Sequence, residues 1–185
     1  MNLDESQLHC QIPCLQLVVE GYAKLPPQSL TRRIKLKVRR YLSPSQERAF
    51  KRFTNDVLNR FSALTSRGVM PTVPPSKDNV PQLEVGDWVR VRSLEEIQAT
   101  LNHWRQLRGC TFMPEMAQYC GTIQRVLKPM QHFVDERDLR VKRSSGIILL
   151  EGVMCQGTAD FGGCDRSCFY FWRAEWLEKL EKTSI

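Results

Sequence analysis

The chain has 185 residues, seven of them cysteine, and a formal net charge of +7. No apolar run approaches the roughly 20 residues that a membrane-spanning helix needs, and residues 1–8 lack the basic and apolar regions of a secretion signal. We therefore expect a cytoplasmic protein without membrane contact. In that reducing compartment an odd number of cysteines indicates thiols or metal ligands more than a disulfide framework.

Positive charge is concentrated in the first third of the chain. Residues 1–68 hold twelve Lys and Arg against five Asp and Glu, whereas residues 69–185 hold fifteen of each. This asymmetry indicates an anionic partner, either nucleic acid or an acidic protein, although a solvated basic face that only aids solubility has the same composition. The candidate contact residues are Arg32, Arg33, Lys35, Lys37, Arg39, Arg40, Arg48, Lys51 and Arg52.

The basic segment is predicted to contain two strands followed by a helix. The first strand spans Leu15 to Tyr22. The second spans Ile34 to Tyr41, where aliphatic residues alternate with Lys and Arg. A period of two is typical of a strand with one buried face and one cationic face.

The strongest local pattern predicts a helix from Pro44 to Ser66. Ser43 is the expected N-cap, Gln46 can complete a capping box with it, and Gly68 follows the end of the helix. An apolar stripe with helical spacing is expected to pack this helix against a core rather than to stack on bases. The stripe consists of Phe50, Phe53, Val57, Leu58, Phe61 and Leu64.

A proline-rich linker is expected to follow. The stretch from Met70 to Pro81 holds four prolines, which fix φ and remove backbone donors. The predicted organisation is a basic α/β segment at residues 1–68, a linker at 69–82 and a second domain at 83–185.

The second domain is predicted to be an α+β fold built on a small SH3-like β-barrel. A tight turn at Gly86-Asp87 enters a strand within Leu83 to Ser93, and a capping box from Ser93 to Glu96 begins a helix. The expected later elements are a short helix from Pro114, strands at Thr122–Val134 and Val141–Met154 with Ile147–Leu150 central in the sheet, and a final helix at Cys168–Lys182.

Four cysteines form the predicted site of this domain: Cys120, Cys155, Cys164 and Cys168. Glycines between the last three supply the backbone freedom that ligation of one ion requires. Zinc held by four thiolates is the first expectation, an iron–sulfur cluster is the alternative, and unligated core or redox thiols are the third interpretation.

Sulfurs that share one zinc would lie roughly 3.5 to 4 Å apart. Should Cys120 lie far from the other three cysteines, the fourth ligand would come from His132, Asp160 or Asp165. The remaining cysteines, Cys10, Cys14 and Cys110, are expected to be terminal thiols and a packing residue.

The sequence shows no arrangement typical of an enzyme. The three histidines belong to no motif with a nucleophile, and the chain has neither a phosphate-binding glycine loop nor a nucleophile elbow. A non-enzymatic protein is therefore favoured.

Several short motifs follow one another along residues 85–180. They are Trp88–Ile97 (WVRVRSLEEI), Phe112–Met116 (FMPEM), Cys120-Gly121, Leu150-Glu151-Gly152, Cys155, Gly163-Cys164, Cys168, Phe171-Trp172 and Trp176-Leu177. Their order resembles an uncharacterised bacterial four-cysteine family whose members are often encoded beside natural-product biosynthesis enzymes. Members usually carry another cysteine in the strand that corresponds to Ile123–Val134, where this chain has Val134. The resemblance implies the four-cysteine site and no particular reaction.

Three functions follow as hypotheses. The first is a metal-binding, non-enzymatic accessory or adaptor protein that docks a larger partner. The second is a nucleic-acid-binding protein that uses the basic N-terminal segment. The third is an iron–sulfur redox or sensor protein.

Overall fold

The computed structural model describes residues 18–21, 30, 34, 41–65, 80–136, 139–157 and 164–181, without the side chains of residues 44, 59 and 61–65. The helices are α2 (Pro44–Thr65), α3 (Leu94–Ala99) and the 3-10 helices η4 (Pro114–Tyr119) and η6 (Ala174–Trp176). The strands are β1 (Trp88–Val91), β2 (Gln106–Leu107), β3 (Cys110–Thr111), β4 (Ile123–Asp135), β5 (Arg140–Leu150), β6 (Trp172–Arg173) and β7 (Leu177–Lys179). Within these residues no helix has the length and apolar character needed to cross a membrane.

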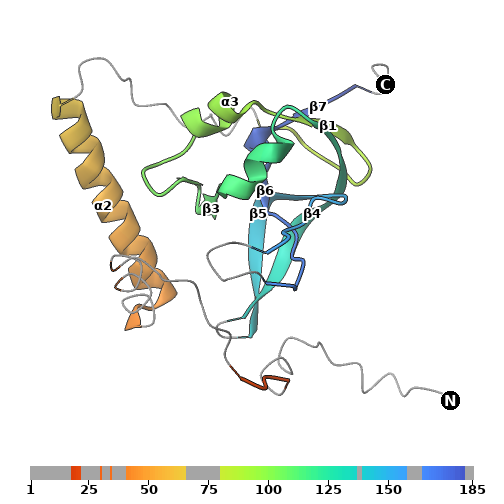
Figure 1. Ribbon diagram of the computed structural model, residues 1–185. Coiled ribbons are helices and arrows are strands. Elements are labelled where there is room, and N and C mark those ends of the chain that lie inside the picture. Colours follow the sequence, from red (N-terminus) through yellow and green to blue (C-terminus); the bar gives the residue numbers. More distant parts are fainter. Residues whose placement is uncertain are drawn as a thin grey trace.

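Five strands form one antiparallel sheet in the order β6-β5-β4-β1-β7, and β2 and β3 form a separate small hairpin (Figure 1). The α+β class is therefore confirmed. The five described strands do not close into a barrel, and both edge strands are short. Strand β6 pairs with β5 at only two positions, and β7 pairs with β1 over three residues.

The long hairpin of β4 and β5 is the central part of the sheet. It confirms the two strands predicted on either side of the charged connection at 135–140. The apolar stretch Ile147–Leu150 is buried and lies in β5, which has a neighbour on each side. Because both faces of this stretch are covered, its residues form a continuous apolar run rather than an alternating pattern.

The pairing of β4 with β5 shifts in the middle of the hairpin. Met130 lies opposite Ile147, but His132 lies opposite Arg143, so β5 carries two extra residues between these pairs. The Ser144 hydroxyl donates a hydrogen bond to the Met130 carbonyl at 2.7 Å within this bulge. Gly146 takes a φ of +66°, which glycine adopts without strain.

The main core is built around aromatic rings. Phe112, Trp172 and Trp176 are almost completely buried. The ring of Phe112 meets that of Trp176 at 5.6 Å and that of Trp172 at 6.4 Å, both edge to face. Such pairs contribute about 0.5–1.5 kcal/mol each beyond the burial of their area.

The predicted C-terminal helix at Cys168–Lys182 is wrong. The described residues of this range form β6, the single turn η6 and β7 instead. The four-residue spacing of Trp172 and Trp176 has the helical period, but the turn η6 brings both indoles into one core from an extended chain. Aromatic residues also favour strands, and pairing of β6 and β7 with the sheet outweighs the helical pattern.

A buried ion pair holds this C-terminal turn. Arg173 and Glu175 are 6 % and 5 % exposed. The guanidinium of Arg173 donates two hydrogen bonds to the Glu175 carboxylate, at 3.0 and 2.8 Å, and a third to the Ser145 carbonyl at 3.0 Å. Arg108, in the turn between β2 and β3, lies 3.3 Å from the same carboxylate. The pair therefore joins the bulge of β5, the small hairpin and η6.

Glycine at position 146 is required beside this pair. A Cβ built on Gly146 would lie 2.8 Å from a terminal nitrogen of Arg173, closer than real Cβ contacts allow. The bulge and the ion pair therefore depend on each other, because the absent side chain leaves room for the guanidinium.

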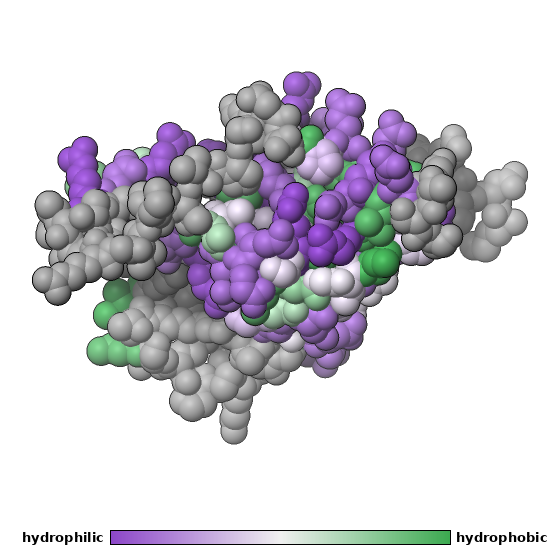
Figure 2. Space-filling view, turned by 90° about the horizontal axis from the view of Figure 1, so that it is seen from above, coloured by the Kyte–Doolittle hydropathy of each residue, from purple (hydrophilic) through white to green (hydrophobic). Residues whose placement is uncertain are grey.

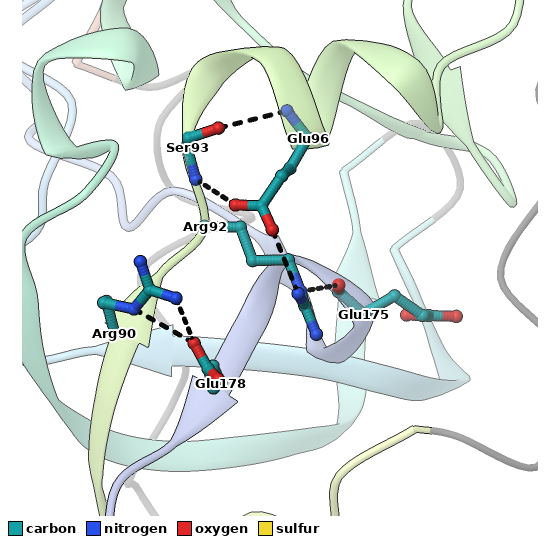
Figure 3. Close-up of polar contacts among 6 residues, drawn as sticks. All are labelled: Arg90, Arg92, Ser93, Glu96, Glu175 and Glu178. Atoms are coloured by element: carbon teal, nitrogen blue, oxygen red, sulfur yellow. Dashed lines mark hydrogen bonds and ion pairs between the residues drawn. The ribbon is translucent and has the colours of Figure 1, made fainter.

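The entry into α3 follows the predicted turn and capping box. Gly86 has a φ of +84° in the turn before β1. Ser93 accepts a hydrogen bond from the Glu96 backbone, and the Glu96 carboxylate accepts one from the Ser93 backbone, which lowers the pKa of Glu96 (Figure 3). The helix ends at Ala99. Figure 3 also shows Arg92 donating to the Glu175 carbonyl at 3.1 Å, which ties the end of β1 to η6.

The N-terminal predictions have mixed outcomes. Helix α2 is confirmed, with reciprocal capping bonds between Ser43 and Gln46. Residues 18–21 of the first predicted strand are not in a strand, and Ile34 and Tyr41 of the second are helical. Isolated period-two patterns are overridden by context when no partner strand fixes them. Most of the predicted linker, residues 69–79, lies outside the described residues.

Replacement of Glu175 by Gln is expected to lower the free energy of unfolding by about 3 kcal/mol, because it leaves the buried Arg173 without its counter-ion. Urea unfolding followed by tryptophan fluorescence measures the change. Glu178→Gln is the matched control, since Glu178 pairs with Arg90 at the surface. Loss of that exposed pair should cost less than about 1 kcal/mol. Equal effects of the two substitutions would contradict the assigned role of the buried pair.

The buried pair also predicts an acid limit to stability. Burial alone would raise the pKa of Glu175, but hydrogen bonds from Arg173 and the charges of Arg173 and Arg108 hold it below the ordinary value of 4.5. The stabilisation is fully present above the unfolded pKa and is lost as the pH falls through the lower folded pKa. Urea midpoints measured from neutral to acidic pH should therefore fall less steeply in Glu175→Gln than in the native chain.

Candidate functional site

Two of the four predicted ligands face each other across a short antiparallel pairing. Met154 bridges to Phe169, so the next residues in register are Cys155 and Cys168. The Cys155 N–H donates to the Cys168 carbonyl at 2.7 Å, and the Tyr170 N–H donates to the Val153 carbonyl at 3.4 Å. Cys155 is half-buried and Cys168 is exposed.

Cys164 lies in the same segment and is exposed. Arg166, which follows it, forms an ion pair with Glu136 at 2.6 Å, beyond the end of β4. The hydrogen bond to Glu136 raises the pKa of Arg166, and the neighbouring Cys168 and Cys164 add to that shift. This contact anchors the cysteine segment beside the β4–β5 hairpin.

Cys120 occupies a different environment at the end of η4. It caps this helix with its backbone and packs, half-buried, against the main core. Burial raises the pKa of its thiol, and the carboxylate of Glu95 raises it further. Cys155 also packs against that core, next to Tyr170, and burial together with the Cys155 thiol raises the pKa of Tyr170 to about 12.

The four thiols are of the kind that binds zinc or iron, but in this structure they are not arranged around one metal position. All four cysteines are described, and within the described ranges no three His, Cys, Asp or Glu side chains gather so that they could hold an ion. Of the other residues considered as a fourth ligand, His132 and Asp165 are exposed, and Asp160 lies outside the description. The pairing of Cys155 with Cys168 is the part of the site that the fold itself builds.

Cys110 is a structural thiol, in keeping with its expected role in packing. Its S–H donates to the Phe171 carbonyl at 3.2 Å. Burial raises its pKa to about 11, with Arg173 and Glu175 nearby as smaller and opposing influences. At neutral pH it is therefore a neutral thiol. Cys10 and Cys14 lie outside the described residues.

Three of the described residues in the apolar stripe of α2 are exposed. Phe50 is 53 % exposed, Phe53 is 67 % exposed and Leu58 is 44 % exposed. The prediction that the described part of this stripe is docked is therefore wrong. Helical spacing shows that apolar residues share a face but does not show what covers that face.

Other exposed apolar side chains of the described residues, such as Trp88, Val141 and Phe171, are spread over several elements, whereas Phe50, Phe53 and Leu58 share one helix. Figure 2 views the molecule from above Figure 1, and the described residues there are mainly hydrophilic, with apolar side chains in small separate patches. Two adjacent exposed phenylalanines on one helix therefore mark α2 as a candidate interaction element.

Three of the nine predicted basic contacts are described, and all lie on α2. Arg48 and Arg52 are exposed, whereas Lys51 pairs with Glu47 at 2.9 Å. The other six, Arg32, Arg33, Lys35, Lys37, Arg39 and Arg40, lie outside the described residues. At 100° per residue, Lys51 lies next to the exposed apolar stripe, whereas Arg48 and Arg52 lie on the other side of α2.

A groove that sequence reasoning missed lies beside the bulge of β5. It has a volume of about 540 Å³ and is bounded by residues 80–83, the middle of β4 and the start of the buried part of β5. Its ionisable lining residues are His132 and Arg143. Only the register shift in β5 reveals this groove, and strand patterns in the sequence carry no sign of such a shift.

Comparisons with protein-family models, with curated proteins and with solved structures found no match to this chain.

Proposed function

We propose that this protein is a non-enzymatic accessory or adaptor protein that docks a larger partner through α2. The observation that carries the proposal is the exposure of Phe50 and Phe53 on one face of a 22-residue helix. Most helices of globular proteins gain their stability from packing of the apolar face, so an exposed face of this kind lacks its main source of stabilisation. A partner protein would supply it.

Burial of these side chains would provide substantial binding energy. Full burial of one exposed phenylalanine gains about 1.5–3 kcal/mol. Phe50 and Phe53 are already partly covered, so burial of the rest would contribute on the order of 2–4 kcal/mol before the costs of association. Aromatic anchors of this kind often dominate the energy of protein interfaces. The remaining residues of the helix would then mainly exclude water.

The positive charge of the N-terminal segment favours an acidic partner over a second copy of this chain. Residues 1–68 carry the whole net charge of +7, and the exposed Arg48 and Arg52 lie on the helix itself. Two copies of this segment would repel each other, whereas a groove rimmed by Asp and Glu would attract it. The occupant we propose for this face is therefore an apolar groove with an acidic rim on a different protein.

The sheet domain would serve as the rigid part of the adaptor. We interpret it as an open relative of the small SH3-like barrels, because five antiparallel strands pack around one main core. We also propose that Cys120, Cys155, Cys164 and Cys168 bind a metal, zinc in the first instance and an iron–sulfur cluster as the alternative. Thiolates are ligands of both zinc and iron–sulfur clusters. The opposed positions of Cys155 and Cys168 support the binding of one metal by at least these two sulfurs.

Replacement of Phe50 and Phe53 together by Ala is expected to abolish recovery of the partner with tagged full-length protein from native extract, because the two apolar anchors are lost. Asp56→Ala is the matched control, since it changes an exposed residue of the same helix. The partner should then be purified, and its affinity for the three chains measured by calorimetry. A partner-free monomer, an unaffected double variant or a homodimer held by these phenylalanines would contradict the proposal.

A separate binding assay distinguishes the nucleic-acid alternative. Retention of single-stranded RNA or duplex DNA at low salt, lost as salt is raised, would favour that function, because phosphate contacts are strongest at low ionic strength. Under the adaptor proposal, the double phenylalanine variant and the native chain should both fail to retain nucleic acid.

Substitution of each cysteine of the proposed metal site by Ser should lower the bound metal per chain and destabilise the sheet domain, because metal binding contributes folding energy in such sites. Elemental analysis after anaerobic purification measures the metal, and a brown colour would identify an iron–sulfur cluster. Cys10→Ser, Cys14→Ser and Cys110→Ser are the controls and should retain the metal. Metal-free native protein would refute the site.

A further inference from the structure

The two cysteines of the C-terminal segment lie opposite each other in an antiparallel register. In antiparallel pairing, residues directly opposite each other and bounded by hydrogen bonds have Cα atoms about 5.5 Å apart, and their side chains leave the same face. The Met154–Phe169 bridge places Cys155 opposite Cys168 at a hydrogen-bonding position, and the Cys155 N–H donates to the Cys168 carbonyl. Disulfides most often join Cα atoms roughly 5.5 to 6 Å apart. Both thiols are free in this structure.

We propose that Cys155 and Cys168 form a reversible disulfide, and that this segment is a thiol-oxidation site. The inference goes beyond the adaptor function and does not depend on it. The oxidant is a low-molecular-weight disulfide of the glutathione class. The product is a covalent link that closes the segment between the two cysteines.

The reaction balances as two successive thiol–disulfide exchanges. The Cys168 thiolate attacks one sulfur of the small disulfide, a mixed disulfide forms, and one small thiol leaves with the proton released by Cys168. The Cys155 thiolate then attacks the Cys168 sulfur, and the second small thiol leaves with the proton from Cys155. Two protein thiols are oxidised to one disulfide, and one small disulfide is reduced to two thiols.

Accessibility sets the order of the two steps. Cys168 is exposed and can meet the oxidant, whereas Cys155 is half-buried against the core beside Tyr170. A half-buried resolving thiol opposite an exposed attacking thiol is suited to the second, intramolecular step. Cys110 and Cys120 lack this cross-strand register with Cys168 in the described pairing.

The same two sulfurs cannot be oxidised and ligate a metal at once. Formation of the link would therefore release any metal that Cys155 and Cys168 hold, and bound zinc would slow the oxidation. The disulfide is expected to form in metal-free protein whether or not the native chain binds zinc, so the two proposals can fail separately.

The experiment equilibrates the full-length, chelator-treated chain with oxidised and reduced glutathione near pH 8, traps free thiols with an alkylating reagent and maps the links by mass spectrometry. Cleavage before Asp160 and Asp165 places Cys155, Cys164 and Cys168 on three separate peptides. We expect one dominant link, between the first and third of these peptides, and an intact mass lower by two hydrogen atoms. The link should revert on addition of excess dithiol.

Two variants sharpen the test. Cys164→Ser should leave the link unchanged, whereas Cys155→Ser should stop the reaction at a glutathione adduct on Cys168. The mapping on native protein does not require any variant to fold. A chain that stays reduced, a dominant Cys164–Cys168 link, or the same mixture of links in native and urea-unfolded protein would overturn the inference.

Discussion

The buried pair of Arg173 and Glu175 is the constraint on which the sheet domain depends. A charged pair inside a small core has a high cost of desolvation, which only near-complete hydrogen bonding offsets. Here the guanidinium reaches both carboxylate oxygens and the Ser145 carbonyl, and Arg108 adds a second cation to the same carboxylate. Four parts of the chain are held by one arrangement: the bulge of β5, β6, η6 and the β2–β3 turn.

The geometry of the bulge follows from this pair. Two additional residues in β5 present the Ser145 carbonyl to Arg173, and Gly146 leaves space for the guanidinium. The shift also changes which residues lie opposite each other beyond it, and it forms one wall of the groove near His132 and Arg143. The bulge that satisfies one buried cation therefore also shapes the groove, which its residues Ser144, Ser145 and Gly146 line directly.

The sequence predicts those elements whose signals are local. Capping at Ser43 and Ser93, the turn at Gly86 and the apolar run at Ile147–Leu150 each depend on a few neighbouring residues, and each prediction is confirmed. The C-terminal helix was mispredicted because Trp172 and Trp176 reach one core through a turn rather than along a helix. The exposure of α2 could not be predicted, since an apolar stripe has the same spacing whether it is covered or not.

The candidate cysteine site, like the fold, could be predicted only in part from the sequence. Clustering of cysteines and glycines in the sequence identifies the segment, but the opposition of Cys155 and Cys168 depends on a pairing register that only the fold supplies. Cys120 illustrates the limit of spacing arguments. It shares the core with Cys155, yet the described residues form no ligand cluster around it.

The turn η6 has a further consequence for the surface of the sheet. Strands β6 and β7 lie at opposite edges of the sheet, but only Ala174–Trp176 separates them in the chain. An extended chain spans at most about 3.5 Å per residue, so the two edges must approach each other closely although they exchange no ladder bonds. The sheet is therefore curled, and β6 and β7 face the same turn. Each of these two strands pairs over only two or three residues, so neither offers the long flat template on which other chains add strands.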